Sequence, residues 1–184
     1  MVRVLDQLPA LIGLTGVVIG GLGTLLTTRL NERSKWQREQ RVRWDARRLD
    51  TYIAYAAVLK ELYAVATRMT AVHRGSATTQ VMDHAVGLET LALTDLRRTR
   101  EWESMLLLGD EPTVVAARNW WLAIVRTERI ARQLPAFERP EWDLAVEGVD
   151  AARDQFYAAA RASLSVDGGS VAQQPYLRTK PWRS

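Results

Sequence analysis

The stretch LIGLTGVVIGGLGTLLTTRL, residues 11–30, decides the fold, because it fits two incompatible structures. Its centre, TGVVIGGLG (residues 15–23), looks like a glycine-rich loop that cradles the phosphates of a dinucleotide. The whole stretch is also apolar enough to be a membrane span. The first interpretation makes the chain a cofactor enzyme, and the second makes it an anchored protein.

The dinucleotide interpretation fails on spacing and on surroundings. A loop of the short-chain-dehydrogenase type has the pattern T-G-x-x-x-G-x-G, but here four residues separate Gly16 from the next G-x-G triplet. Three residues do separate Gly16 from Gly20, but Gly20-Gly21-Leu22 is not a G-x-G triplet. Such a loop also needs a preceding strand and an acid about 20 residues further on that holds a ribose hydroxyl. Asp45 stands at that distance, but within a charged helical stretch. We therefore expect no nucleotide cofactor.

The membrane interpretation agrees with length and charge. No charged residue occurs from Gln7 to Thr28, and these residues as a helix reach about 33 Å, enough for a hydrocarbon core of about 30 Å. The excess of Lys and Arg directly after the span predicts a cytoplasmic C-terminal side. A cleaved signal peptide would carry its positive charge before the apolar run, and a buried core helix is the other alternative.

The sequence thus divides into five segments. We expect an extracytoplasmic N-terminus (1–7), a transmembrane helix (8–28), a basic juxtamembrane helix (29–48), a cytoplasmic helical bundle (49–165) and a flexible tail (166–184). The protein would then lie in the cell membrane as a single-pass protein, with its N-terminus outside and its C-terminal domain in the cytoplasm.

Small residues recur along one face of the expected span. Gly16, Gly20 and Thr24 are four residues apart, which leaves a shallow groove where a second transmembrane helix can approach closely. We expect homo-oligomer formation or partner binding at this face. The alternative is a glycine-rich span that only inserts into the bilayer.

Residues 29–48 account for the high pI of about 9.7, with eight Lys or Arg and three acids. Side chains within about a Debye length of the membrane can bind anionic headgroups. The residues close enough for lipid contact are Arg29, Arg33, Lys35 and Trp36. The alternative is a topology signal on a solvated helix. Nucleic acid is not an expected partner, because the stretch lacks a recognisable nucleic-acid-binding motif.

Beyond the connector, apolar residues recur at three- and four-residue spacing, and no segment alternates as a strand does. The expected core face of the first bundle helix is Leu49, Tyr52, Ile53, Ala56, Leu59, Tyr63, Ala66 and Thr70. The second helix is expected to begin at Ser76 or Thr78 and to end near Leu108. Its expected apolar face is Val81, Ala85, Leu88, Ala92, Trp102 and Met105.

The sequence GDEP at residues 109–112 is the clearest helix boundary, with a terminating glycine, a capping acid and a first-turn proline. A third helix is expected over about 111–134, and a fourth from Arg139 to about Leu164. The short connections favour antiparallel neighbours. The predicted fold is all-α: a transmembrane helix that continues into an up-down antiparallel four-helix bundle.

Four strings resemble a group of uncharacterised actinobacterial membrane proteins, largely from streptomycetes. They are RVRWDARRLDTYIAYA (41–56), REWESMLLLGDEPTVVAA (100–117), VDAARDQFYAAARASL (149–164) and QQPYLRTK (173–180). The resemblance covers most of residues 40–180 and implies one N-terminal span with a helical domain. No activity is attached to this group, so the resemblance implies no catalytic residue.

The sequence offers no candidate catalytic, metal or cofactor site. The chain has no cysteine, and His73 and His84 are eleven residues apart across an expected turn, without metal-ligand spacing. Aromatic residues are the candidates for contact with an unknown cytoplasmic protein. They are Trp120 and Trp121, which as neighbours on a helix cannot both face one seam, and Tyr176 and Trp182 in the tail.

We therefore expect a non-enzymatic binding or scaffold protein at the cytoplasmic face of the membrane. One alternative is an oligomeric pore, which is disfavoured because the span has no polar lumen-facing row beyond Thr15, Thr24 and Thr28. The other is an enzyme with an unrecognised site in the bundle.

Overall fold

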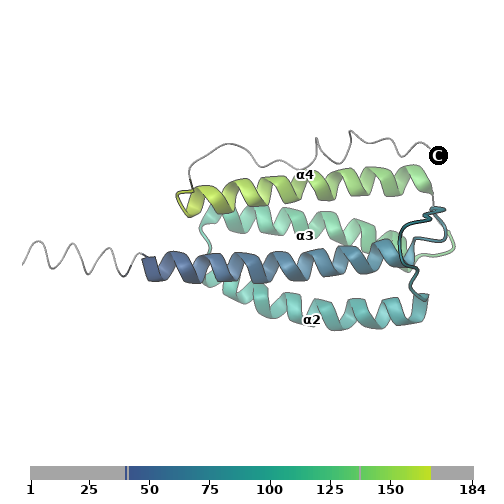
Figure 1. Cartoon of the computed structure of the whole chain (residues 1–184), viewed down its shortest axis with the longest axis horizontal. Helices are drawn as coiled ribbons and strands as arrows, with labels where there is room; N and C mark the ends of the chain where they lie inside the picture. Colours follow the sequence, from purple (N-terminus) through teal and green to yellow (C-terminus); the bar gives the residue numbers. More distant parts are fainter. Residues whose placement is uncertain (1–39, 41, 137, 167–184) are drawn as a thin grey trace, which may run out of the picture. The chain divides into compact units, whose positions relative to one another are not determined.

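The computed structural model describes residues 40, 42–136 and 138–166. All regular structure in these residues is α-helical, without strands, which confirms the predicted all-α bundle. The helices are a first helix over residues 42–69, α2 (His84–Leu108), α3 (Glu111–Arg132) and α4 (Arg139–Ser163) (Figure 1). The residues from Arg47 onward form one compact unit, and the packing described below lies within it.

The first helix runs antiparallel to α2. The Arg48 Nε–H, near the start of the first helix, donates to the carbonyl of Leu108 at the end of α2, at 2.9 Å. Further along the first helix, Glu61 pairs with Arg97, which lies earlier in α2. Because one residue number rises as the other falls, the two helices run in opposite directions.

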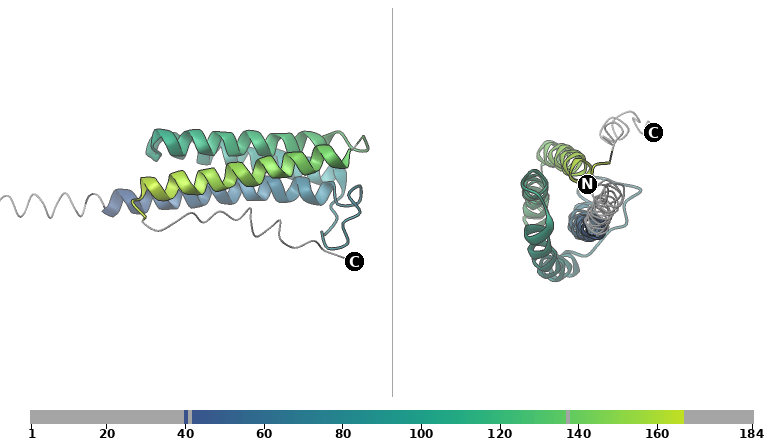
Figure 2. Two further views of the ribbon diagram at one scale, coloured as in Figure 1. Left: turned by 90° about the horizontal axis from the view of Figure 1, so that it is seen from above. Right: turned by 90° about the vertical axis from the view of Figure 1, so that its left-hand side faces the viewer.

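The first helix and α4 are antiparallel as well. The Ser163 hydroxyl at the end of α4 donates to the Tyr52 hydroxyl at 3.1 Å. At the other end of the bundle, the Arg74 guanidinium lies 5.0 Å from the ring centroid of Trp142, near the start of α4. The ribbons lie lengthwise beside one another in both lengthwise views (Figures 1 and 2). The result is the expected up-down arrangement.

The start of α2 differs from the prediction. The helix begins at His84, where the Asp83 carboxylate accepts from the backbone N–H groups of Ala85 and Val86 at 2.9 and 3.2 Å. The Ser76 hydroxyl instead donates to Thr79 within the loop. A capping carboxylate close to the apolar run thus takes precedence over the earlier hydroxyls.

The boundary between α2 and α3 is confirmed. The Gly109 N–H donates to the Met105 carbonyl at 2.9 Å and closes the last turn of α2. The Asp110 carboxylate accepts from the Thr113 N–H at 3.2 Å and caps α3. The expected start of α4 at Arg139 is also confirmed, although Glu138 makes no side-chain cap bond.

The core is centred on the first helix, α3 and α4. The expectation was wrong for Leu49, Ile53 and Val81, which are 46%, 58% and 54% exposed, and for Ala85 and Ala92, which are exposed as well. The first helix buries a row displaced from the predicted one, so that Leu49 and Ile53 fall at its edge. The largest fully buried side chains are Trp120, Tyr55, Phe156, Leu59, Leu62, Leu91, Met105 and Ile124.

Candidate functional site

Helix α2 presents a row of large apolar side chains to solvent. We define the α2 outer row as Val86, Leu93, Leu96 and Leu107, which are 53%, 58%, 70% and 82% exposed. At 100° per residue these four positions fall within about 80° of one another, so they share one face. Glu89 and Arg100 stand on the same face of this helix. The row is therefore an apolar surface interrupted by one charge of each sign.

The opposite face of α2 buries few residues, and half of these are small or polar. The buried residues of α2 are Gly87, Leu91, Thr94 and Met105. A side chain at position 87 would place its Cβ 2.6 Å from the sulfur of Met69, so glycine permits the close approach of α2 to the first helix. The Arg97–Glu61 ion pair and the Thr94 hydroxyl, 3.4 Å from Glu61, lie along the same interface. The glycine contact, the ion pair and the buried Leu91 and Met105 hold α2 in place, while the four large apolar residues of the outer row face outward.

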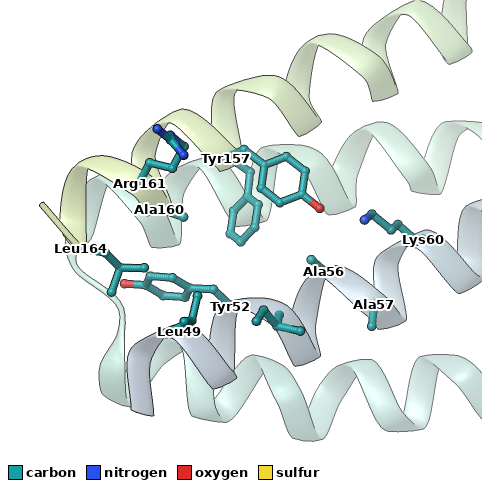
Figure 3. Close-up of a pocket in the computed structure, with 11 residues that line it drawn as sticks. Leu49, Tyr52, Ala56, Ala57, Lys60, Tyr157, Ala160, Arg161 and Leu164 are labelled. Atoms are coloured by element: carbon teal, nitrogen blue, oxygen red, sulfur yellow. The ribbon is translucent and has the colours of Figure 1, made fainter. Parts of the chain in front are cut away.

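A second surface feature lies between the first helix and α4. It is an apolar pocket of about 310 Å³ (Figure 3). The pocket is lined by Leu49, Tyr52, Ile53, Ala56, Ala57, Lys60, Phe156, Tyr157, Ala160, Arg161 and Leu164. The Tyr52 and Phe156 rings meet edge to face with centroids 6.3 Å apart, and the Tyr52–Ser163 hydrogen bond joins the two helices beside them. These contacts fix one end of the pocket.

The adjacent tryptophans of α3 have different environments. Trp120 is 1% exposed and packs on Phe156 with ring centroids 5.4 Å apart. The bundle core encloses the indole of Trp120, so the described surface does not present it to a partner. Trp121 is half-buried, and the guanidinium of Arg98 lies 4.4 Å from its ring centroid. Of the pair, Trp121 alone reaches the surface.

Burial shifts the pKa of side chains in the bundle, among them Tyr55 and Glu128. Burial raises the pKa of the Tyr55 phenol to about 12, so that it stays neutral across the physiological range. Burial also raises the pKa of Glu128, whose nearest cation is Arg132. Within residues 40, 42–136 and 138–166, no three His, Cys, Asp or Glu side chains come together as metal ligands.

The remaining sequence-based candidates lie outside the described residues. These are the expected packing face Gly16, Gly20 and Thr24, the interface residues Arg29, Arg33, Lys35 and Trp36, and the tail residues Tyr176 and Trp182. The expected transmembrane helix, 8–28, is also among the undescribed residues. In the part of the chain that is described, no helix has the length and apolar character needed to cross a membrane.

Sequence reasoning missed both surface features. The outer row could have been noticed, because α2 contains more leucines than one core face accommodates, and Leu93, Leu96 and Leu107 were absent from the predicted face. The pocket had no comparable signal, since its lining comes from segments about 100 residues apart.

Comparisons with known proteins add no functional information. No protein-family model, curated protein or solved structure matches the chain.

Proposed function

We propose that this protein is a single-pass membrane protein whose cytoplasmic helical bundle binds another protein through the α2 outer row. The observation that carries the proposal is the exposure of Val86, Leu93, Leu96 and Leu107 on one face of α2. Large apolar side chains gathered on one helix face typically mark an interaction site. The bundle would then act as a binding or scaffold module held close to the membrane.

The chemistry of the row suits a helix of the partner. From Val86 to Leu107 the face extends about 32 Å, which matches helix-on-helix packing over several turns. A partner with apolar residues at three- and four-residue spacing would bury the four side chains. Glu89 and Arg100 on the same face would favour a partner with complementary charges, which would fix its register.

The membrane anchor rests on the sequence. Residues 8–28 carry no charge, and the excess of basic residues follows them directly. Basic residues directly after a span favour a cytoplasmic C-terminal side, so the bundle would lie in the cytoplasm. Residues Gly16, Gly20 and Thr24 support self-association within the bilayer, and residues 29–36 supply the basic and aromatic side chains for contact with lipid headgroups.

The partner site is tested on α2 itself. Proteins that co-purify with the full-length chain from native membranes should be lost when Leu93→Glu and Leu96→Glu are combined. The matched control is Leu144→Glu on α4, a position that is 71% exposed and distant in sequence from the row. Equal recovery of partners from the double variant and the control would refute the role of the outer row.

The anchor and its orientation are tested by thiol labelling, since the chain has no cysteine of its own. We expect a cysteine at Val2 to react with a membrane-impermeant maleimide in intact cells. A cysteine at Ala77, in the loop before α2, should react only after permeabilisation. Labelling of Ala77→Cys in intact cells, or release of the protein from membranes by alkaline carbonate, would contradict this topology.

A further inference from the structure

We propose that the apolar pocket between the first helix and α4 binds a single-chain anionic amphiphile of the fatty-acid type, with its carboxylate near Lys60. None of the lining residues belongs to the α2 outer row, so this site is separate from the proposed protein contact. The inference holds whether or not α2 binds a partner.

The size and lining of the pocket fit an alkyl chain. Its volume of about 310 Å³ lies at the lower end of small-molecule sites, which span about 300–1,000 Å³. Nine of the eleven lining residues are aliphatic or aromatic, and the other two are Lys60 and Arg161. The lining contains no carboxylate. An occupant with an apolar body and one negative charge matches this composition.

Polar groups of the pocket lie at both of its ends, with Arg161 and the Tyr52 hydroxyl beside Leu164 and with Lys60 at the opposite end (Figure 3). Figure 3 places Lys60 at the end toward which the Tyr157 hydroxyl points, with Leu49 and Leu164 at the opposite end. The Lys60 ammonium lies 5.5 Å from the centroid of the Tyr157 ring. Among the described residues Lys60 forms no ion pair with a carboxylate. A ligand carboxylate at this end could pair with Lys60 and accept a hydrogen bond from Tyr157.

The end of the pocket that holds Arg161 and Tyr52 also offers apolar surface to the chain of the ligand. Leu49 and Ile53 are 46% and 58% exposed, although both line the pocket. Along the first helix the distance from Lys60 to Leu49 is about 16 Å. An extended alkyl chain over this distance would cover both side chains, which accounts for large aliphatic residues at these exposed positions.

Two other occupants fit less well. A phospholipid has two acyl chains, and a pocket of about 310 Å³ has room for one. The C-terminal residues 167–184 follow closely after Leu164, but they contain three basic side chains and one acid. Their net charge has the same sign as Lys60 and Arg161, so charge complementarity favours an anionic ligand.

The test is photolabelling of the full-length protein in phosphatidylcholine nanodiscs. The probe is dodecanoate with a diazirine on its terminal carbon, and mass spectrometry of peptides locates the label. We expect labelling near Leu49 and Leu164, and competition by excess dodecanoate. Dodecyltrimethylammonium, which has the same chain and the opposite charge, should not compete.

Matched variants separate the pocket from general partition into the bilayer. Ala57→Trp fills the pocket from an exposed position and should abolish the label, whereas Ala64→Trp, an exposed residue of the same helix outside the lining, should not.

Lys60→Gln should raise the dodecanoate concentration needed for competition by up to about fivefold, the usual effect of an exposed ion pair. Arg126→Gln, on the exposed face of α3, is its control. Circular dichroism verifies that each variant folds.

Several results would overturn the proposal. Labelling that is equal in the wild type and Ala57→Trp would show partition into lipid only. Equal competition by the cationic amphiphile would remove the role of Lys60. Pocket labelling by a photoreactive phosphatidylglycerol that dodecanoate cannot displace would assign the pocket to membrane lipid. Labelling that appears only after deletion of residues 167–184 would assign it to the C-terminal segment of the chain.

Discussion

Helices α3 and α2 are similar in length but contribute very differently to the bundle. Of the 22 residues of α3, nine are buried, among them Trp120 and Ile124. Of the 25 residues of α2, four are buried, and two of those are Gly87 and Thr94. Helix α3 therefore uses most of its apolar side chains for folding, whereas α2 keeps four large ones on its outer row.

The difference indicates which part of the bundle is available for binding. A helix that serves only the core places its large apolar residues inward and its polar residues outward. Helix α3 follows this rule more closely than α2, with Val115 and Leu122 as its exposed large apolar residues, and Asp110 caps it. Helix α2 meets the first helix through a glycine and an ion pair, and its outer row would gain free energy by contact with a partner. Variants on α3 should therefore affect mainly stability, and variants on the outer row mainly binding.

The largest expected effect concerns the two adjacent tryptophans of α3. Trp120→Ala removes a fully buried indole that packs on Phe156, and should lower the free energy of unfolding by about 3–5 kcal/mol. Trp121→Ala removes a half-buried ring stacked beneath Arg98, and should cost about 1 kcal/mol. Denaturant unfolding of the full chain in detergent, followed by far-ultraviolet circular dichroism, measures both. Equal losses would contradict the contrast between the core and the surface of α3.

A smaller effect is expected where α2 approaches the first helix. Gly87→Val places new atoms against Met69, which is 3% exposed and has little room to move, and should cost about 1–3 kcal/mol. Combined with Met69→Ala, it should cost less than the sum of the two single losses, because the clash is removed.

Gly148 in α4 provides the control for this position. A Cβ built there meets no atom within 4 Å, so Gly148→Val should be neutral or slightly stabilising. If Gly87→Val were tolerated equally well in the same unfolding assay, the close contact between α2 and the first helix would not be a determinant of stability.

The sequence predicted those features that depend on local chemistry. The Gly109–Asp110 boundary and the start of α4 at Arg139 follow from capping residues and first-turn prolines, which act within a few residues. The start of α2 was misplaced because hydroxyl and carboxylate residues compete as caps over residues 76–83, and the outcome depends on how the loop contacts the first helix. In that loop the Met82 N–H donates to the Arg68 carbonyl at 3.2 Å.

The candidate sites were less predictable, because they depend on which side of each helix meets its neighbours. Periodicity placed Leu49 and Ile53 in the core, but the first helix is rotated so that both reach solvent beside α4. Spacing also could not tell which of Trp120 and Trp121 faces inward, since either orientation gives an apolar stripe. The pocket combines residues 49–60 with residues 156–164, and a long-range pairing of this kind is not encoded in local periodicity.

The smallest expected effect concerns Glu128, which lies on α3 where that helix faces α2. Burial raises the pKa of its carboxyl above the ordinary range, the nearby Asp95 of α2 raises it further, and Arg132 at 3.7 Å only partly opposes them. A raised pKa in the folded state means that the folded chain binds the proton more tightly than the unfolded chain. The contribution of this group to stability is therefore fully present below about pH 4 and is lost as the pH rises through the folded-state pKa.

Glu128→Gln removes this titration. The free energy of unfolding of the variant should decline less than that of the wild type between about pH 4 and 7, when both are measured by denaturant unfolding across that range. Glu103→Gln, an exposed residue of α2, makes the same chemical change outside the interface and should follow the wild-type profile. If Glu128→Gln also followed the wild-type profile, the Glu128 carboxyl would be well solvated. Water would then reach the border between α2 and α3 next to the buried residues Thr127 and Ile130. The expected weaker pH dependence of Glu128→Gln would instead show that Glu128 belongs to the water-excluded interior of the bundle.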